Sequence, residues 1–193
     1  RKLVFDWLSG PLAEDWRSAD LANIPQWSRS VSHWQELSLG QGWKVEAHIE
    51  TVCPQLILPD KFESYLSTLS GKQRREIRRK LRRAAGEGAR AVFIDPGEED
   101  PAAIDEFIAL MQASGAEKAA FLSPQMHAAF GDILRVTQAA GMLGLCFLEL
   151  EGRRLAAYAY FSMGETIYLY NSGYEPGAYA LLSPGWVLLA QLI

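Results

Sequence analysis

The segment Ser183-Pro184-Gly185 holds the residues whose types and order are most informative for chemistry. Ser183 is a typical helix N-cap residue, and Pro184 suits the first helical position, where its missing N–H costs nothing. Gly185 lets other atoms approach the backbone closely. Free N–H groups of a first helical turn, with the positive end of the helix dipole, favour an anion such as phosphate. The segment predicts either an anion-binding turn over residues 182–187 or the start of a well-capped core helix.

A second group of chemically active residues is the basic cluster at residues 72–83. It contains eight lysines and arginines and one acid, Glu76, which gives a net charge of +7. Because the whole chain carries −4, the remaining residues carry −11. Like charges four residues apart on a helix cost roughly 0.2–0.5 kcal/mol per pair. We therefore expect negative charge, from acidic residues of the chain or from an anionic partner or surface, to offset the repulsion along this helix.

Metal and disulfide chemistry are not indicated. Cys53 and Cys146 lie far apart, and the three histidines match no metal-ligand spacing. We expect no metal and a reducing, cytoplasmic compartment. The apolar runs are too short to cross a bilayer, so no transmembrane segment is expected, and no signal peptide is visible. The chain begins without Met and stops in an apolar run, which suggests a fragment.

The elements that must position these residues follow from periodicity. Residues 1–42 show no sustained period, whereas alternation over 43–50 predicts a strand. A long helix is expected from about residue 60 to 85, followed by a short buried strand over 89–94. Two helices are then predicted. One starts near Pro101, and the other starts at Ser123-Pro124 and stops near Gly141.

Residues 143–173 predict a three-stranded antiparallel meander. Three strand-like segments are joined by tight links that contain Gly152 and Gly164, and glycine suits such hairpins because it accepts positive φ. Both faces of the middle segment are apolar, which implies helices on both sides of the sheet. The predicted fold class is therefore α/β (α+β), with a meander covered by helices on both faces.

Residues 44–193 resemble the GNAT acetyltransferases, and more closely the CelD-like domains of polysaccharide synthesis, relatives of the Fem-type aminoacyltransferases. The resemblance lies in three stretches of the sequence, which are residues 69–83, residues 154–158 (Arg-Leu-Ala-Ala-Tyr), and residues 168–174 together with Ser183-Pro184-Gly185. It implies a mixed sheet that is incomplete at its C-terminal end. It also implies three regions: residues 1–60 as the tail of a preceding domain or an irregular segment, 61–88 as a basic connecting helix, and 89–193 as a truncated acyltransferase domain.

The same resemblance implies an acyl-CoA donor, with its pantetheine arm along residues 168–172 and its pyrophosphate at the turn after them. The cofactor-binding residues expected at that turn are Leu182, Ser183, Gly185, Trp186 and Val187. The usual GNAT phosphate loop is richer in glycine and often includes Gln or Arg, so this turn departs from the pattern. Fem-type relatives use aminoacyl-tRNA instead of CoA, which leaves that donor as an alternative.

For acyl transfer, the attacking amine must lose a proton and the thioester carbonyl needs a hydrogen-bond donor. The candidate catalytic residues are Tyr170, Asn171 and Tyr174, with a backbone N–H near Asn171 as carbonyl donor and Glu149 as a remote candidate base. In the resembling fold the general acid comes from a later helix. Aromatic residues of a meander also commonly serve packing alone.

Three partners of the basic cluster stay open. They are the acidic remainder of the chain (Glu98, Glu99 and Asp100), an anionic ligand such as CoA phosphate, acidic glycan or tRNA, and an anionic membrane surface. The anion-binding residues expected are Arg75, Arg78, Arg79 and Arg82. The leading function is an N-acyltransferase that uses acyl-CoA, possible alternatives being a tRNA-binding module, a Fem-type transferase or an inactive scaffold. The sequence leaves the acceptor and the oligomeric state open.

Overall fold

The computed structural model describes residues 2–10, 13–177 and 179–193, and it divides the chain into two compact units, residues 1–57 and 58–193. The first unit contains helices α1 (Lys2–Ser9) and α2 (Ser30–Ser38) and a cluster of aromatic side chains. The ring of Phe5 lies 5.7 Å from that of Trp34 and 4.9 Å from that of Trp43, and Trp16 meets Trp43 edge-on at 4.9 Å.

The strand predicted over residues 43–50 is wrong. This segment has neither helical nor strand structure, and its apolar residue Ile49 is 81% exposed. A strand needs a neighbour to satisfy its backbone groups. Among the described residues of this unit no second strand offers one, so alternation alone does not produce a strand.

The predicted long helix is two helices, α3 (Phe62–Thr68) and α4 (Gly71–Gly86). The break lies at Leu69, whose backbone is extended, and at Ser70, which caps α4. Ser70 Oγ accepts a hydrogen bond from Gln73 N, and Gln73 Oε1 accepts one from Ser70 N. This capping box satisfies the backbone locally and therefore starts a new helix.

The second unit is built on a four-stranded antiparallel sheet in the order β1-β2-β3-β4. The strands are β1 (Arg90–Ile94), β2 (Leu143–Leu150), β3 (Arg153–Met163) and β4 (Thr166–Tyr174). The predicted meander is confirmed. Its first hairpin turns at Glu151 and Gly152, which both have positive φ (52° and 76°) as a tight two-residue turn requires. Within the described residues every strand pair is antiparallel, so the parallel pair of a mixed sheet is absent there.

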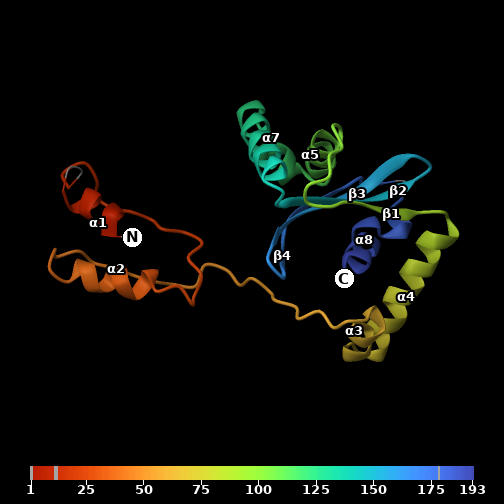
Figure 1. The fold of residues 1–193 in the computed structure, drawn as a ribbon, viewed down its shortest axis with the longest axis horizontal. Helices are drawn as coiled ribbons and strands as arrows, with labels where there is room; N and C mark the ends of the chain where they lie inside the picture. The colour runs from red at the N-terminus through yellow and green to blue at the C-terminus, as the bar shows by residue number, and fades with distance from the viewer. Residues whose placement is uncertain (1, 11–12, 178) are drawn as a thin grey trace. The chain divides into compact units, whose positions relative to one another are not determined.

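Helices cover both faces of the sheet, which confirms the predicted fold class (Figure 1). Helices α5 (Ala103–Ala113) and α7 (Pro124–Ala139) lie on one face, and α4 and α8 (Pro184–Leu192) lie on the other. The short α6 (Ala116–Phe121), which periodicity did not reveal, packs on α5. Alternate residues of β2 enter the two cores: Phe147 packs with Phe107 on the α5 side, and Cys146 packs with Leu188 on the α8 side.

Strand β4 lies at the edge of the sheet and pairs only with β3 among the described residues. Its large side chains are 44–49% exposed; they are Ile167, Tyr168, Leu169, Tyr170 and Tyr174. Backbone groups along the outer edge of β4 are therefore available to pair with another extended molecule, except at Ser172, whose N–H and carbonyl oxygen bond to Asn171 Oδ1 and Lys118 Nζ. Among the described residues, no helix combines the length and apolar character that a bilayer crossing requires.

Candidate functional site

The first turn of α8 follows a 3₁₀ turn, Ala180–Leu182, and begins at Ser183. Ser183 has a left-handed backbone (φ 53°, ψ 56°), and its side chain makes no capping hydrogen bond. Ser183 and Pro184 therefore occupy the predicted N-cap and first helical positions, but the Ser183 hydroxyl does not cap the helix. The first backbone hydrogen bond of α8 runs from Val187 N to Ser183 O (3.0 Å). The N–H groups of Gly185 and Trp186 precede this bond and so have no carbonyl partner within the helix.

The residues expected to bind the cofactor at this turn divide into two sets. The side chains of Leu182 and Val187 are buried, 6% and 2% exposed, and belong to the core. Trp186 is 62% exposed, and Gly185 lies half-buried at the same turn. Any ligand at this turn therefore meets backbone N–H groups and the Trp186 ring, while Leu182 and Val187 hold the turn in place.

Two cations of α4 lie beside this turn. Arg83 Nη1 donates to the carbonyl oxygen of Leu181 (3.2 Å), and Lys80 Nζ lies 5.4 Å from the centre of the Trp186 ring. Sequence reasoning missed both residues. The signal that it could have used is their position next to the apolar stripe of α4, of which Leu81 and Ala84 pack in the core with α8. We name the first turn of α8 together with Lys80 and Arg83 the phosphate corner.

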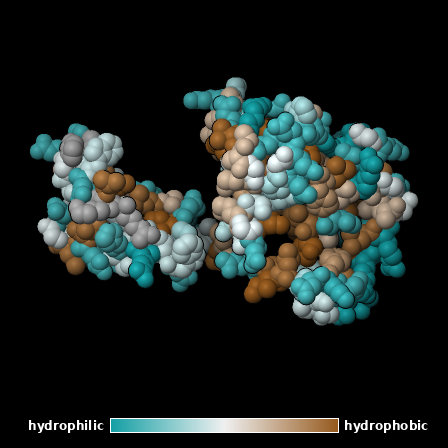
Figure 2. Space-filling view, in the orientation of Figure 1, coloured by the Kyte–Doolittle hydropathy of each residue, from teal (hydrophilic) through white to brown (hydrophobic). Residues whose placement is uncertain are grey.

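The residues predicted to bind an anion on α4 have different surroundings. Arg78 pairs with Glu63, and Arg79 makes two hydrogen bonds to Glu76 (2.8 and 2.7 Å) that hold the pKa of the Glu76 carboxyl below its usual value. Arg75 and Arg82 are exposed, and they have no partner among the described residues. Figure 2 shows the hydrophilic surface that results along α4. Two of the acids suggested as partners bond elsewhere: Asp100 pairs with Arg154, and Glu98 accepts a hydrogen bond from the backbone N–H of Asp95.

Strand β4 carries the three predicted catalytic residues. Its register with β3 shifts between Ala159 and Tyr160, which face Asn171 and Leu169, so that Tyr170 is an extra, bulged residue. The ring of Tyr170 stacks on Phe130 at 5.8 Å and also contacts Phe161 at 5.1 Å. Tyr170 therefore has a packing role on the α5 face of the sheet.

Asn171 is held by a lysine from α6. Lys118 Nζ donates to Asn171 Oδ1 (3.0 Å) and to the carbonyl oxygen of Ser172. The backbone N–H of Ser172 donates to the same Oδ1 (2.8 Å). Lys118 is half-buried, and this burial lowers the pKa of its ammonium group. Sequence analysis did not single out Lys118, because it lies 53 residues from Asn171 in a short helix without a strong period.

The phosphate corner and Asn171 are connected through β3. Tyr158 faces Ser172, the residue next to Asn171, across the β3–β4 ladder. The Tyr158 hydroxyl donates to the carbonyl oxygen of Gly185 (3.3 Å). The turn at Gly185 therefore lies on the α8 face of the sheet beside Ser172, whereas Asn171, which faces Ala159 of the other core, has its side chain on the α5 face. The remaining predicted catalytic residue, Tyr174, is 44% exposed and faces Ala156.

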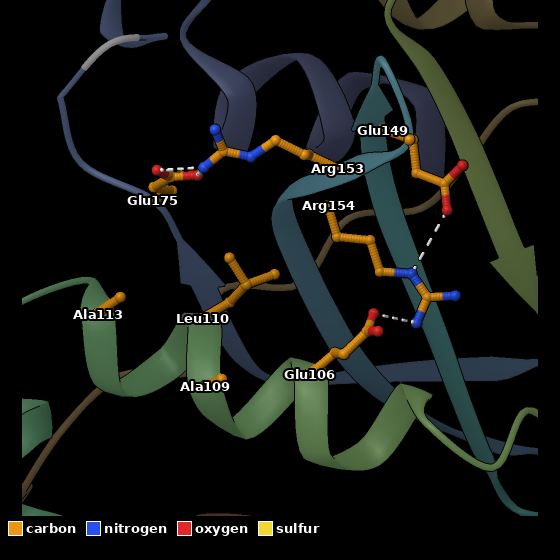
Figure 3. A pocket seen from close by; sticks show the side chains of 9 residues that line it. Glu106, Ala109, Leu110, Ala113, Glu149, Arg153, Arg154 and Glu175 are labelled. Carbon is orange, nitrogen blue, oxygen red and sulfur yellow. Dashed lines mark hydrogen bonds and ion pairs between the residues drawn. The ribbon is translucent and has the colours of Figure 1, made fainter.

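An open groove of about 660 Å³ lies along α5, between this helix and the β2–β3 hairpin (Figure 3). Its charged residues pair with one another: Arg154 points between Glu106 and Glu149, and Arg153 binds Glu175. Glu149, the remote candidate base, also binds Arg90 and therefore contributes to this ion network. The groove thus carries little uncompensated charge.

Cysteine and metal chemistry find no support in the described residues. Burial raises the pKa of the Cys146 thiol to about 12, so it stays protonated at neutral pH. Within residues 2–10, 13–177 and 179–193 no group of three His, Cys, Asp or Glu side chains is arranged to hold a metal ion.

A family model of the GNAT acetyltransferase domain matches residues 71–193, which include α4, the whole sheet and α8. The chain belongs to the GNAT acetyltransferase family. Its chemistry is accordingly acyl transfer. A comparison with curated proteins finds no match to the chain.

Both features of the candidate site, the phosphate corner and the Lys118–Asn171 contact at β4, lie within the matched region. The matched region begins at the first residue of α4, so the basic helix that supplies Lys80 and Arg83 belongs to the GNAT domain. It also contains Lys118 and the whole of β4. Residues 1–57 lie outside the match.

Proposed function

We propose that this GNAT domain transfers an acyl group from an acyl-CoA to an amine. The observation that carries the proposal is the phosphate corner, where the N–H groups of Gly185 and Trp186 precede the helical ladder and Lys80 and Arg83 lie beside them. Helix N-termini bind phosphate through such N–H groups and the helix dipole. The nearby cations add attraction for the pyrophosphate of CoA.

We place the pantetheine arm of the donor along the outer edge of β4. The pantetheine arm of CoA contains amide groups, and an extended chain with amides pairs with the outer edge of a strand by main-chain hydrogen bonds. Exposed Ile167 and Leu169 give this edge an apolar character. In this arrangement the thioester lies near the bulge of β4 at Tyr170 and Asn171.

The transfer reaction requires a defined movement of atoms. The amine nitrogen forms a bond to the thioester carbonyl carbon, the C–S bond breaks, and the amine loses a proton to a base or to water. CoA leaves as a thiol after protonation. We propose an amine of a polysaccharide or cell-envelope precursor as the acceptor, on the sequence resemblance to CelD-type domains alone.

The first experiment measures donor binding. We expect acetyl-CoA and CoA to raise the melting temperature in proportion to ln(1 + [L]/Kd), because they bind only the folded chain. Arg83→Glu places a negative charge at the phosphate corner and should weaken binding at least tenfold. Lys72→Glu is the matched control, since it changes the same charge on the first turn of α4, roughly 16 Å away along the helix.

Two outcomes would contradict the proposal. One is an unchanged melting temperature with millimolar acetyl-CoA. The other is equal weakening of CoA binding by Arg83→Glu and Lys72→Glu, which would mean that general charge rather than the corner holds the ligand.

A second candidate is a Fem-type function that uses aminoacyl-tRNA. The observation that favours it is the set of exposed cations on α4 without partners in the described chain, which includes Arg75 and Arg82. RNA binding through such residues weakens steeply as salt rises. If tRNA binds and the double variant Arg75→Glu, Arg82→Glu leaves its affinity unchanged, this candidate fails.

A further inference from the structure

The carboxamide of Asn171 can take only one orientation at the bulge of β4. Its oxygen faces two donors, the Lys118 ammonium at 3.0 Å and the backbone N–H of Ser172 at 2.8 Å. If the carboxamide were rotated by half a turn, its NH₂ group would face both donors. An NH₂ group cannot accept their hydrogen bonds, so this orientation is unfavourable. The contacts of Asn171 therefore fix which end of the amide is free.

The free end is the amide nitrogen, Nδ2. Asn171 is half-buried at the edge strand, so Nδ2 remains accessible, and it has no hydrogen-bond partner among the residues that the structure describes. Both bonds to Oδ1 withdraw electron density from the amide and strengthen Nδ2–H as a donor. A ligand at this strand therefore meets a pre-oriented donor.

The contacts of Lys118 suit it to hold Asn171 and Ser172 in position. Its ammonium bonds to two neutral oxygens, Asn171 Oδ1 and the carbonyl of Ser172, and to no carboxylate in the described chain. These two oxygens belong to adjacent residues of β4, so one lysine from α6 fixes both the side chain and the backbone at the bulge. Burial of the ammonium favours retention of these hydrogen bonds.

We propose that Asn171 Nδ2 donates a hydrogen bond to the thioester carbonyl of the acyl donor and that Lys118 is the positioning residue that orients it. This inference rests on the proposed function, because it needs an acyl-CoA along β4. As the amine attacks, negative charge grows on the carbonyl oxygen, and a donor fixed in advance stabilises that charge without reorganisation.

The proposal separates two residues by role. Asn171 contacts the reacting carbonyl and is a catalytic residue, whereas Lys118 acts only through Asn171. A role for Lys118 in folding alone would change the melting temperature without changing the environment of the bound carbonyl. The test therefore observes the carbonyl itself.

The experiment records the ¹³C resonance of [1-¹³C]acetyl-CoA bound to the full chain. We expect a downfield displacement on binding to the wild type, since a hydrogen bond polarises the carbonyl. Asn171→Asp keeps an oxygen for Lys118 but replaces Nδ2 by a second acceptor, so the displacement should disappear. Lys118→Met should reduce the displacement, and Lys118→Arg, which retains a cation, should restore most of it.

A comparison of acetyl-CoA with CoA gives a second measurement. One neutral hydrogen bond corresponds to roughly a three- to tenfold change in affinity. The ratio of the Kd for CoA to the Kd for acetyl-CoA should therefore be about three to ten times larger for the wild type than for Asn171→Asp. The affinity for CoA itself should stay within about threefold in every variant, because the phosphate corner is unchanged. Melting temperatures of the free variants confirm that each one is folded.

The outcomes distinguish this inference from the function on which it rests. If acetyl-CoA binds but the resonance is the same in the wild type and Asn171→Asp, the inference is overturned and donor binding stands. If Lys118→Met leaves the displacement intact, the positioning role of Lys118 is overturned. If acetyl-CoA does not bind the wild type, the proposed function fails and this inference fails with it.

Discussion

Arg154 holds together the charged end of the sheet. Its side chain, 16% exposed, contacts Asp100 (2.6 Å), Glu106 (2.7 Å) and Glu149 (3.4 Å), and its guanidinium lies 4.0 Å from the centre of the Phe147 ring. Burial by itself lowers the pKa of Arg154, but the bond to Asp100 and the nearby carboxylates outweigh it and raise that pKa. The hydrogen bond from Arg154 in turn lowers the pKa of Asp100.

Replacing Arg154 tests this network at the scale of one residue. Arg154→Met should lower the free energy of unfolding at pH 7 by about 3 kcal/mol, because it leaves partly buried carboxylates without their partner. The stabilisation that ionised Asp100 gains from Arg154 is complete above the pKa of Asp100 in the unfolded chain, about 3.9. It is lost as the pH falls through the lower pKa of Asp100 in the folded protein. The difference between wild type and variant in urea unfolding should therefore shrink from pH 7 to pH 3. A difference that stays constant or grows would contradict this role.

At the scale of elements, the backbone of α5 packs closely against β4 at Gly173. A Cβ atom added there would lie 2.3 Å from Met111 N and 2.5 Å from Leu110 C, both backbone atoms that cannot move alone. Only glycine allows this contact. It sets the distance between α5 and the strand that carries Asn171.

Gly173→Ala should therefore destabilise the protein by roughly 2–3 kcal/mol, since helix and strand must move apart. Gly185→Ala is the matched control, because a Cβ there meets only the Tyr158 hydroxyl at 3.9 Å. Urea unfolding should show a large loss for the first variant and nearly none for the second. Equal stability of both variants would mean that the α5–β4 contact is looser than the structure shows.

At the scale of the whole molecule, the chain consists of two units with a charged, helix-rich segment opening the second. Residues 51–59 at the boundary have neither helix nor strand, and Val52 and Ile57 there are 78% and 94% exposed. Exposed backbone without secondary structure is the preferred substrate of proteases. We propose that residues 58–193 form an independent folding unit.

Limited digestion with thermolysin, which cleaves at large apolar residues, tests this division. Cleavage should fall within residues 43–59, which include the exposed Ile49, Val52 and Ile57, and leave a resistant fragment that includes α4, the sheet and α8. The fragment should keep the CoA-induced rise in melting temperature, because the phosphate corner lies within it. Earlier cleavage inside α4 or the meander would contradict the division.

The sequence by itself determined most local elements of the second unit, although it did not reveal α6 or the break between α3 and α4. Tight glycine-containing links at Gly152 and Gly164 set the meander, and Ser123-Pro124 set the start of α7, where Ser123 Oγ accepts a bond from Met126 N. It also indicated the fold class, because two apolar faces of one strand require cover on both sides. These features depend on neighbours within a few residues, and so they are encoded in short segments.

Only the tertiary structure decided which distant side chains meet. Lys118 contacts Asn171 across 53 residues. The cations that reach Leu181 and Trp186 at the start of α8 are Arg83 and Lys80, of which Lys80 also lies 4.0 Å from Glu76, whereas Arg78 and Arg79 bind acids. The strand expected at residues 43–50 is absent for the same reason, since pairing depends on a partner strand that the segment itself cannot provide. Periodicity reports the faces of an element, while contacts between elements depend on how those faces pack.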